Sequence, residues 1–278
     1  MVTGANAGIG RACAGQLAAR GATVVMLCRS RERGEEARQA IARDTGGDVR
    51  LVLADLGSQQ SVRAAAAELA REHARIDVLV NNAAAFNLSQ RAPSVGGDGV
   101  ETIWSTNHLG PFLLTLLLLD RLVAAGGRVV NVSSLGLVVM PWLRLDLDDP
   151  DSRGSFSVTR AYYRSKIAQC AFTVELARRY PALQANVVRV ANVALPDDRL
   201  PPLNPVTRWF YRNVKRRFAL TPDRMADTYV WLALDAPPAI HGLHIDERRR
   251  SIGYPRQVAD EAFRSALWSL SERQTALT

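Results

Sequence analysis

Apolar runs alternate with amphipathic segments along almost the whole chain. Short runs rich in Val, Leu and Ile predict buried strands, and apolar positions recurring every three or four residues predict helices. Strands are expected at 2–3, 23–28, 50–54, 78–81, 128–133, 186–190 and 243–246. Helices are expected near 9–20, 31–44, 58–73, 98–124, 160–180, 222–235 and 256–272. This alternation predicts an α/β fold with one doubly wound parallel sheet of about seven strands and helices on both faces.

Composition is consistent with one large core. The chain has 278 residues, of which 47% are hydrophobic, and no repeat or linker divides it. We therefore expect residues 1–278 to form a single domain. No apolar stretch reaches the ~18 residues of a membrane span, and no signal peptide is recognisable. The three cysteines lie far apart without metal-ligand spacing, which predicts reduced thiols, no metal site and a cytoplasmic location.

The formal net charge of +8 does not by itself indicate nucleic-acid binding. The arginines are spread along the chain, many lie beside acids, and aromatic residues do not interleave with a basic stripe. We expect neither nucleic acid nor a membrane as partner. The positive charge would instead attract an anionic cofactor.

A glycine-rich turn follows the first predicted strand. The segment Thr3–Gly10 reads TGANAGIG and opens a helical pattern that ends at Gly21. Glycines let the backbone approach a pyrophosphate, and the start of the following helix offers free N–H groups. A glycine loop alone is often only a turn, but the helix and strand that follow favour a dinucleotide site. The candidate residues are Gly4, Asn6, Gly8, Ile9 and Gly10.

Polar residues follow three further strands, where an open parallel sheet binds its ligands. Asp55 and Leu56 come after the third strand, Asn82 and Ala83 after the fourth, and Ser134 closes the fifth. Asp55 would approach an adenine ring, and an alternative is that it belongs to a helix N-cap. The Ser134 hydroxyl would hold a carbonyl oxygen, and the alternative is a serine that caps the strand end.

Tyr162 and Lys166 lie four residues apart in a predicted helix, on one face. A neighbouring ammonium is expected to lower the pKa of the phenol toward neutrality, which would make Tyr162 an acid or base. The alternative is an ordinary solvated face. Tyr163 is one residue out of phase and is expected to face elsewhere. Asn107, in the apolar run NHLGPFLLTLLLL, must be hydrogen-bonded inside; it either stabilises a kink or holds a water beside Lys166.

In order and spacing, these motifs resemble those of the short-chain dehydrogenase/reductase family, and the resemblance extends from residue 1 to about 190 and more loosely to the end of the chain. The segments CRSRERGEEAR, NHLGPFLLT and AYYRSK are most similar to the retinol dehydrogenase-related branch. The resemblance implies a Rossmann-like fold and a tetrad of Ser134, Tyr162, Lys166 and Asn107. Ser134 would polarise a carbonyl, Tyr162 would transfer the proton, Lys166 would bind the nicotinamide ribose, and Asn107 would position a relay water.

Cofactor choice depends on the end of the second strand. An acid there would hold the ribose of NAD, whereas an arginine accommodates the 2′-phosphate of NADP. The chain has Arg29 and Ser30 at this point and no acid. The guanidinium fork suits phosphate, so we expect NADP(H) in preference to NAD(H).

The chain departs from the family at two places, and its first strand is unusually short. Ala84 replaces a usual glycine, and Ala191-Asn192 replaces a usual Pro-Gly, without the threonine that normally follows. Backbone groups near Val193 are expected to hold the nicotinamide instead. Only Met1 and Val2 precede the glycine turn, so a form extended by several apolar residues is expected to be more stable.

Residues 194–220, rich in proline and aromatics, predict a substrate lid that contributes Leu195 and Trp209. Trp142 would form the opposite pocket wall. The aromatics indicate an apolar, cyclic or lipid-like substrate, although a lid packed on the protein's own core would have the same composition. The family resemblance also suggests a homodimer or homotetramer formed through the two long helices.

The sequence therefore predicts an NADP(H)-dependent oxidoreductase that acts on a carbonyl or on a secondary or allylic alcohol. The alternative is a non-catalytic nucleotide-binding regulatory or scaffold protein on the same fold. The altered segment at 191–192 and the short first strand favour this alternative, and the four tetrad residues oppose it.

Overall fold

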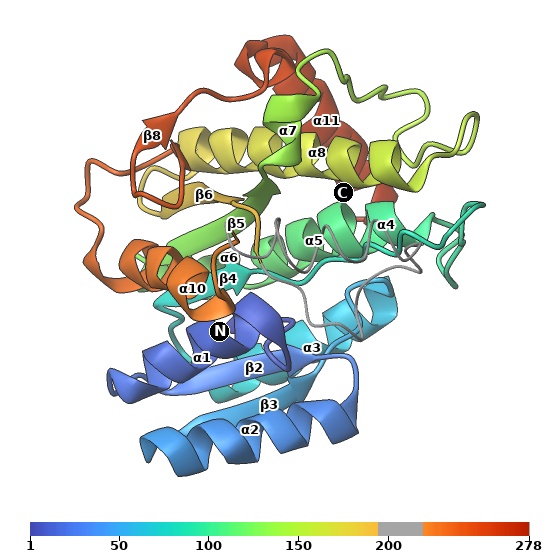
Figure 1. Cartoon of the computed structure of the whole chain (residues 1–278). Helices are drawn as coiled ribbons and strands as arrows, with labels where there is room; N and C mark the ends of the chain where they lie inside the picture. The colour runs from blue at the N-terminus through green and yellow to red at the C-terminus, as the bar shows by residue number, and fades with distance from the viewer. Residues whose placement is uncertain (194–218, 278) are drawn as a thin grey trace.

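One sheet organises the part of the chain that the computed structural model describes, residues 1–193 and 219–277 (Figure 1). Its strand order is β3-β2-β1-β4-β5-β6-β7-β8. The strands are β1 (Val2–Thr3), β2 (Val24–Cys28), β3 (Val49–Leu53), β4 (Val78–Asn81), β5 (Arg128–Ser134), β6 (Gln184–Val190), β7 (His244–Ile245) and β8 (Ser251–Ile252). Strands β1 to β7 pair in parallel, and β8 pairs antiparallel to β7.

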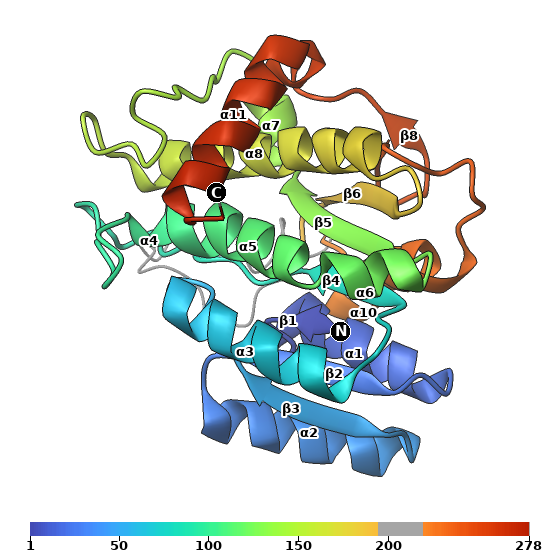
Figure 2. The same ribbon diagram turned by 180° about the vertical axis from the view of Figure 1, so that it is seen from behind.

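Helices cover both faces of the sheet, as Figures 1 and 2 show from opposite sides. The first layer contains α1 (Gly8–Ala19), α2 (Arg31–Thr45) and α10 (Pro222–Val230), which continues as the π-helix η4 (Trp231–Asp235). The second contains α3 (Gln59–Glu72), α4 (Thr102–Trp104), the π-helix η1 (Ser105–Leu109), α5 (Gly110–Leu117), α6 (Leu119–Ala124) and α8 (Val158–Arg179). The remaining elements are α7 (Gly136–Val139), the 3-10 helix η5 (Arg256–Ala259) and α11 (Glu261–Gln274), which packs on α8.

Strand β2 shows how the core is divided between these layers. Val24, Met26 and Cys28 pack into the cluster that includes α1, α2 and α10. Val25 and Leu27 pack into the opposite cluster with α3, α5 and α8. Successive side chains of a strand point to opposite faces, so a strand covered on both sides must be apolar throughout, as all of β2 is.

The expected fold class is confirmed, with differences in detail. The segment expected as one helix over 98–124 begins at Thr102 and is divided into α4, η1, α5 and α6. Strand β8 was not expected, because it has only two residues and no apolar run; the turn held by Asp246, whose Oδ1 accepts from the Arg248 and Arg250 amides, sets it against β7. The short helix α7 was also missed.

The centre of the sheet determines where a ligand can enter. Strand β1 pairs with β2 on one side and with β4 on the other, so the order of the strands reverses there. It has two residues, and the amino group of Met1 donates to the Val78 carbonyl at 2.7 Å. In open parallel sheets the crevice at such a reversal, beyond the carboxyl ends of the strands, is the usual ligand site.

Among the described residues, no helix has both the length and the apolar content that crossing a membrane requires.

Candidate active site

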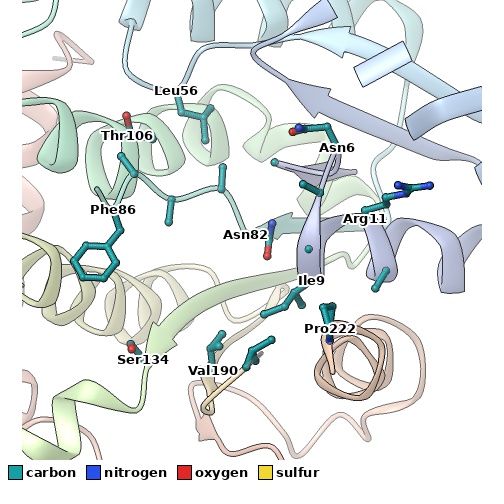
Figure 3. A pocket seen from close by; sticks show the side chains of 18 of the residues that line it. Asn6, Ile9, Arg11, Leu56, Asn82, Phe86, Thr106, Ser134, Val190 and Pro222 are labelled. Carbon is teal, nitrogen blue, oxygen red and sulfur yellow. The ribbon is translucent and has the colours of Figure 1, made fainter. Parts of the chain in front are cut away.

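A cavity of about 1490 Å³ lies beyond the carboxyl ends of the central strands. Figure 3 shows that Asn6 and Arg11 lie at one end of it, and that Ser134 and Phe86 lie at the other. Most of the sequence-predicted cofactor residues line this space: Gly4, Asn6, Gly8, Ile9, Arg29, Ser30, Asp55, Leu56, Asn82, Ala83 and Val193. Ser134 and Tyr162 line it as well. The structure thus brings the predicted cofactor residues and the predicted catalytic residues Ser134 and Tyr162 together in one cavity.

The glycine turn has the backbone that its sequence predicts. Gly4 and Gly8 have φ values of 63° and 57°, a region that disfavours other residues. Gly10 lies beneath the turn: a Cβ there would stand 2.4 Å from Asn82 Nδ2 and 2.5 Å from the Gly4 carbonyl oxygen. Helix α1 begins at Gly8, so its free N–H groups face the cavity edge where a pyrophosphate would fit.

Asn82 and Ala83 connect the end of β4 to the end of β1. The Asn82 Nδ2 donates to the Thr3 carbonyl at 2.9 Å, and the Ala83 amide donates to Thr3 Oγ1 at 2.9 Å. These bonds hold the glycine turn against β4. Ala84, which stands where a glycine was expected, also lines the cavity.

Exposed arginines surround the end of the cavity next to β2. Arg29 follows the strand directly, and Arg11 and Arg33 line the same space. Within the described ranges, none of these three guanidinium groups has an ion-pair partner. Ser30 is the N-cap of α2 and its Oγ accepts from the Arg33 amide at 3.4 Å. Arg33 was not predicted from the sequence, although its position four residues after Arg29 could have indicated that it lines the same space.

Asp55 holds the turn that follows β3. Its Oδ1 accepts from the Gly57 amide at 2.9 Å, and its own amide donates to Ser61 Oγ at 2.9 Å. The N-cap of α3 is Ser58, not Asp55. Asp55 therefore holds the turn just before the helix and does not cap it, and both Asp55 and Leu56 line the cavity.

Tyr162 and Ser134 lie together at the other end. The expected lowering of the Tyr162 pKa is wrong for the chain alone, because burial raises the pKa of this phenol and Tyr163 adds to the effect. Hydrogen bonding with the Ser134 hydroxyl offsets only part of the rise. Tyr162 therefore keeps its proton at neutral pH, the form in which a phenol acts as an acid.

Lys166 does not line the cavity but lies beneath it, with 2% of its surface exposed. Its Nζ donates to the Val132 carbonyl at 3.0 Å and lies 5.5 Å from the centre of the Tyr162 ring. Burial lowers the pKa of Lys166 to about 8. The helical spacing thus brings the ammonium beside the phenol, as predicted. Burial, however, favours the uncharged form of each group.

Asn107 lies in the π-helix η1, so the predicted interruption of the helix is real. Its Oδ1 accepts from the Ala85 amide at 2.6 Å, and its Nδ2 donates to the Ala85 carbonyl at 3.1 Å and to Ser165 Oγ at 3.1 Å. The Asn107 carbonyl accepts from Gln169 Nε2 at 2.7 Å. The side chain therefore fixes the loop after β4 against α8, next to Lys166.

Two aromatic residues of the site were not predicted. Phe86 stacks on Tyr162 with ring centres 4.2 Å apart and remains 41% exposed in the cavity. Tyr163 was expected to face elsewhere, but it lines the cavity beside Tyr162, with ring centres 5.2 Å apart. That expectation is wrong because Gly136, which carries no side chain, leaves room for the Tyr163 ring.

The substrate-pocket predictions have mixed outcomes. Trp142 is 74% exposed and does not line the cavity, whereas Val139 of the same segment does. Leu195, Trp209 and nearly all of the expected lid, residues 194–218, lie outside the described residues. Val190 to Val193 line the cavity, and the Asn192 carbonyl accepts from the Leu220 amide at 2.9 Å.

The fold and the cavity define a dinucleotide-binding α/β protein with a serine, a tyrosine and a lysine at one end of its site. The family model of the short chain dehydrogenases matches residues 1–143. Retinol dehydrogenase 14 of Mus musculus is 36% identical over 98% of this chain and 84% of its own length.

Solved structures agree. An uncharacterised protein of Mycobacterium paratuberculosis is 31% identical, with a TM-score of 0.74 over 99% of this chain and 91% of its own. A proposed NAD(P)-dependent gluconate 5-dehydrogenase of Beutenbergia cavernae, with NADP bound at low occupancy, is 28% identical, with a TM-score of 0.65 over 88% of this chain and 93% of its own.

The chain therefore belongs to the short-chain dehydrogenase/reductase family, in its retinol dehydrogenase-like branch. It is an oxidoreductase of a family that uses NAD(P)(H).

Proposed function

We propose that this chain is an NADP(H)-dependent oxidoreductase that reduces the carbonyl of an apolar substrate, or oxidises the corresponding secondary or allylic alcohol, with Tyr162 as the acid or base. The observation that carries the proposal is the single cavity, which contains the glycine turn and the arginines at one end and Ser134 with Tyr162 at the other.

The residues present fit a dinucleotide. The glycine turn offers backbone N–H groups at the start of α1, and the absence of a side chain at Gly10 lets the turn pack against Asn82. The bound cofactor would supply or accept the hydride. The chain's own groups would bind it through Asn6, Gly8, Ile9, the arginines and the backbone at Val193, all of which line the cavity.

The proton is handled by Tyr162. Because burial keeps the phenol protonated, the reductive direction is the one that the chain alone supports best: the Tyr162 hydroxyl donates to the substrate oxygen. The Ser134 hydroxyl would donate a second hydrogen bond to the same oxygen. Lys166 supplies positive charge beneath Tyr162 and favours the phenolate that forms when the proton leaves.

The substrate end of the cavity is apolar. Phe86 presents a flat, partly exposed ring next to Tyr162, and Leu135 and Val139 line the same cavity. Such a lining favours a hydrophobic substrate. The similarity to retinol dehydrogenases makes allylic alcohols and their aldehydes the first compounds to test.

The test of the reaction compares the wild type with Tyr162→Phe. Both should show a thermal shift with NADPH, because Tyr162→Phe keeps the ring and leaves the glycine turn and the arginines intact. Only the wild type should consume NADPH with a panel of apolar aldehydes and ketones. Equal turnover by the variant would exclude Tyr162 as the acid. Cofactor binding without turnover by the wild type would favour a non-catalytic nucleotide-binding role.

The test of cofactor preference removes one guanidinium. Arg29→Ala should weaken NADPH binding by about 10- to 100-fold, the value of a charge-assisted hydrogen bond of about 1.5–3 kcal/mol, and should leave NADH binding unchanged. Arg31→Ala is the matched control, because Arg31 lies two residues away and does not line the cavity. An equal loss for both cofactors in Arg29→Ala, or a wild type that prefers NADH, would refute the NADP(H) assignment.

A further inference from the structure

The ring of Phe86 has no role in the proton transfer proposed above. It belongs to the segment between β4 and α4 and lies at the same end of the cavity as Ser134 (Figure 3). Although it is a large apolar side chain, 41% of its surface is exposed. Burial of that surface would stabilise the chain. An apolar ring left open inside a cavity is therefore typical of a ligand contact.

The backbone that carries Phe86 is held in place by Asn107. Asn107 Oδ1 accepts from the Ala85 amide at 2.6 Å, and Asn107 Nδ2 donates to the Ala85 carbonyl at 3.1 Å. Ala85 and Tyr162 also pack against the same small apolar cluster. The residue just before Phe86 is thus fixed on both sides of its backbone, so the position of the ring follows from a held segment.

One face of the Phe86 ring is covered, and the other is not. The rings of Phe86 and Tyr162 stack with centres 4.2 Å apart and planes 27° apart. Among the described residues, no second ring stacks on Phe86. The exposed surface therefore belongs to the opposite face and the edge of the ring, which line the cavity. A flat group of a ligand can stack on such a face.

We propose that Phe86 is a specificity-determining residue: its free face stacks on a flat, unsaturated ring bonded directly to the substrate carbonyl carbon, and it thereby favours aryl aldehydes and ketones over saturated ones. This role rests on the proposed function, in which the carbonyl oxygen approaches Tyr162 and Ser134. Conjugation keeps an aryl carbonyl in the plane of its ring. Stacking of the ring on Phe86 therefore also fixes the plane of the carbonyl, and alignment of this kind accelerates a reaction.

The deciding experiment compares benzaldehyde with cyclohexanecarbaldehyde in NADPH-dependent reduction. The two have the same carbon skeleton, and only the first has a flat ring. The ratio of their kcat/KM values should be about 2- to 10-fold lower in Phe86→Leu than in the wild type, the factor that an aromatic pair contributes beyond the area it buries. The comparison of ratios cancels the intrinsic difference in reactivity. Phe86→Tyr keeps the ring and should keep the ratio.

Two results would overturn the proposal directly. The first is an unchanged ratio in Phe86→Leu, which would show that the ring does not distinguish flat from puckered substrates. The second is faster turnover of both aldehydes in this variant, which would make the ring an obstacle to the substrate.

Two control variants separate stacking from apolar contact in general. Leu88→Ala changes an exposed apolar residue of the same segment that does not line the cavity, so both aldehydes should keep their wild-type rates. Val139→Ala trims an aliphatic residue that lines the cavity, so it should lower both rates by a similar factor. A fall in the ratio as large as that of Phe86→Leu, in either control, would assign the effect to apolar contact and refute stacking.

A binding measurement does not depend on turnover. Benzamide and cyclohexanecarboxamide have the same two rings on an amide carbonyl, and their affinities can be measured by ligand-observed NMR titration. Phe86→Leu should weaken benzamide binding by about 2- to 10-fold and leave cyclohexanecarboxamide unchanged. If the wild type reduces neither aldehyde, the proposed function fails, and the amides still decide the role of Phe86. No benzamide binding by the wild type, or an equal loss for both amides, would overturn the inference.

Discussion

Replacement of Lys166 by methionine should stabilise the protein in the absence of cofactor, although it removes a residue of the site. The ammonium is 2% exposed, its hydrogen bond goes to a carbonyl, and no carboxylate among the described residues pairs with it. Burial lowers the pKa of Lys166 from 10.5 to about 8. One unit of pKa corresponds to about 1.4 kcal/mol, so burying the charge costs about 3 kcal/mol at pH 7.

The direction of the pH dependence follows from the pKa of Lys166 in the folded and the unfolded chain. Because the pKa is lower in the folded chain, the unfolded chain binds the proton more tightly between pH 8 and 10.5, and native stability rises with pH through this window. Methionine has a similar shape and no charge to bury. The gain in Lys166→Met should therefore be about 3 kcal/mol at pH 7, about 2 kcal/mol at pH 9 and close to zero above pH 10.5.

The assay is urea unfolding of wild type and variant at these pH values, read by circular dichroism. Arg160→Met, an exposed cation on the same helix α8, is the control and should change stability by no more than about 0.5 kcal/mol. A Lys166→Met variant that is no more stable than the wild type at pH 7, or whose gain does not depend on pH, would refute the reasoning. The Lys166→Met variant should also lose turnover. The buried ammonium would therefore serve the reaction while it lowers the stability of the folded chain.

Two more predictions concern the turn and the acid side of the stability profile. Gly10→Ala should abolish the thermal shift with NADPH and cost about 1–3 kcal/mol of stability, because its Cβ would stand 2.4 Å from Asn82 Nδ2. Gly15→Ala is the control: its Cβ would lie 4.0 Å from Ile41, so stability should be unchanged or higher. Burial lowers the pKa of His108 to about 3 and that of His244 to about 4. At a pH below about 6.5, the usual pKa of histidine, both imidazoles therefore take up a proton when the chain unfolds. The free energy of unfolding measured in urea should fall by about 4 kcal/mol between pH 7 and pH 5. A flat profile over that range would contradict the second prediction.

The parallel strands were predictable because burial on both faces leaves no polar position, as β2 shows. Strand β8 was not, since its two residues owe their place to the turn at Asp246 and to pairing with β7. The division of the long helix was only partly predictable: Asn107 indicated an interruption, but whether a polar residue produces a kink, a π turn or a plain buried bond depends on its tertiary partners.

The site was predictable where it follows strand ends, because these ends meet at one edge of the sheet. Gly4, Asn82 and Ser134 are of this kind. Tyr163 was missed because helical phase gives the direction of a Cβ and not the reach of a long side chain into space left by a distant glycine. The direction of the Tyr162 pKa was missed because spacing gives the nearby charge, whereas the degree of burial is a property of the whole fold.

The π-helix η1 affects both the site, through Asn107, and the core, through the helix α5 that follows it. A π turn contains one residue more than an α turn. Deletion of a single residue within Ser105–Leu109 that restores regular helical bonding would therefore leave the phase of α5 nearly unchanged, and Phe112–Leu114 would stay buried with α3 and α8. Deletion of a residue inside α5 would instead rotate the residues that follow it by about 100°. The core should therefore tolerate the loss of a residue in this segment better than a loss within α5, provided that Asn107 is kept.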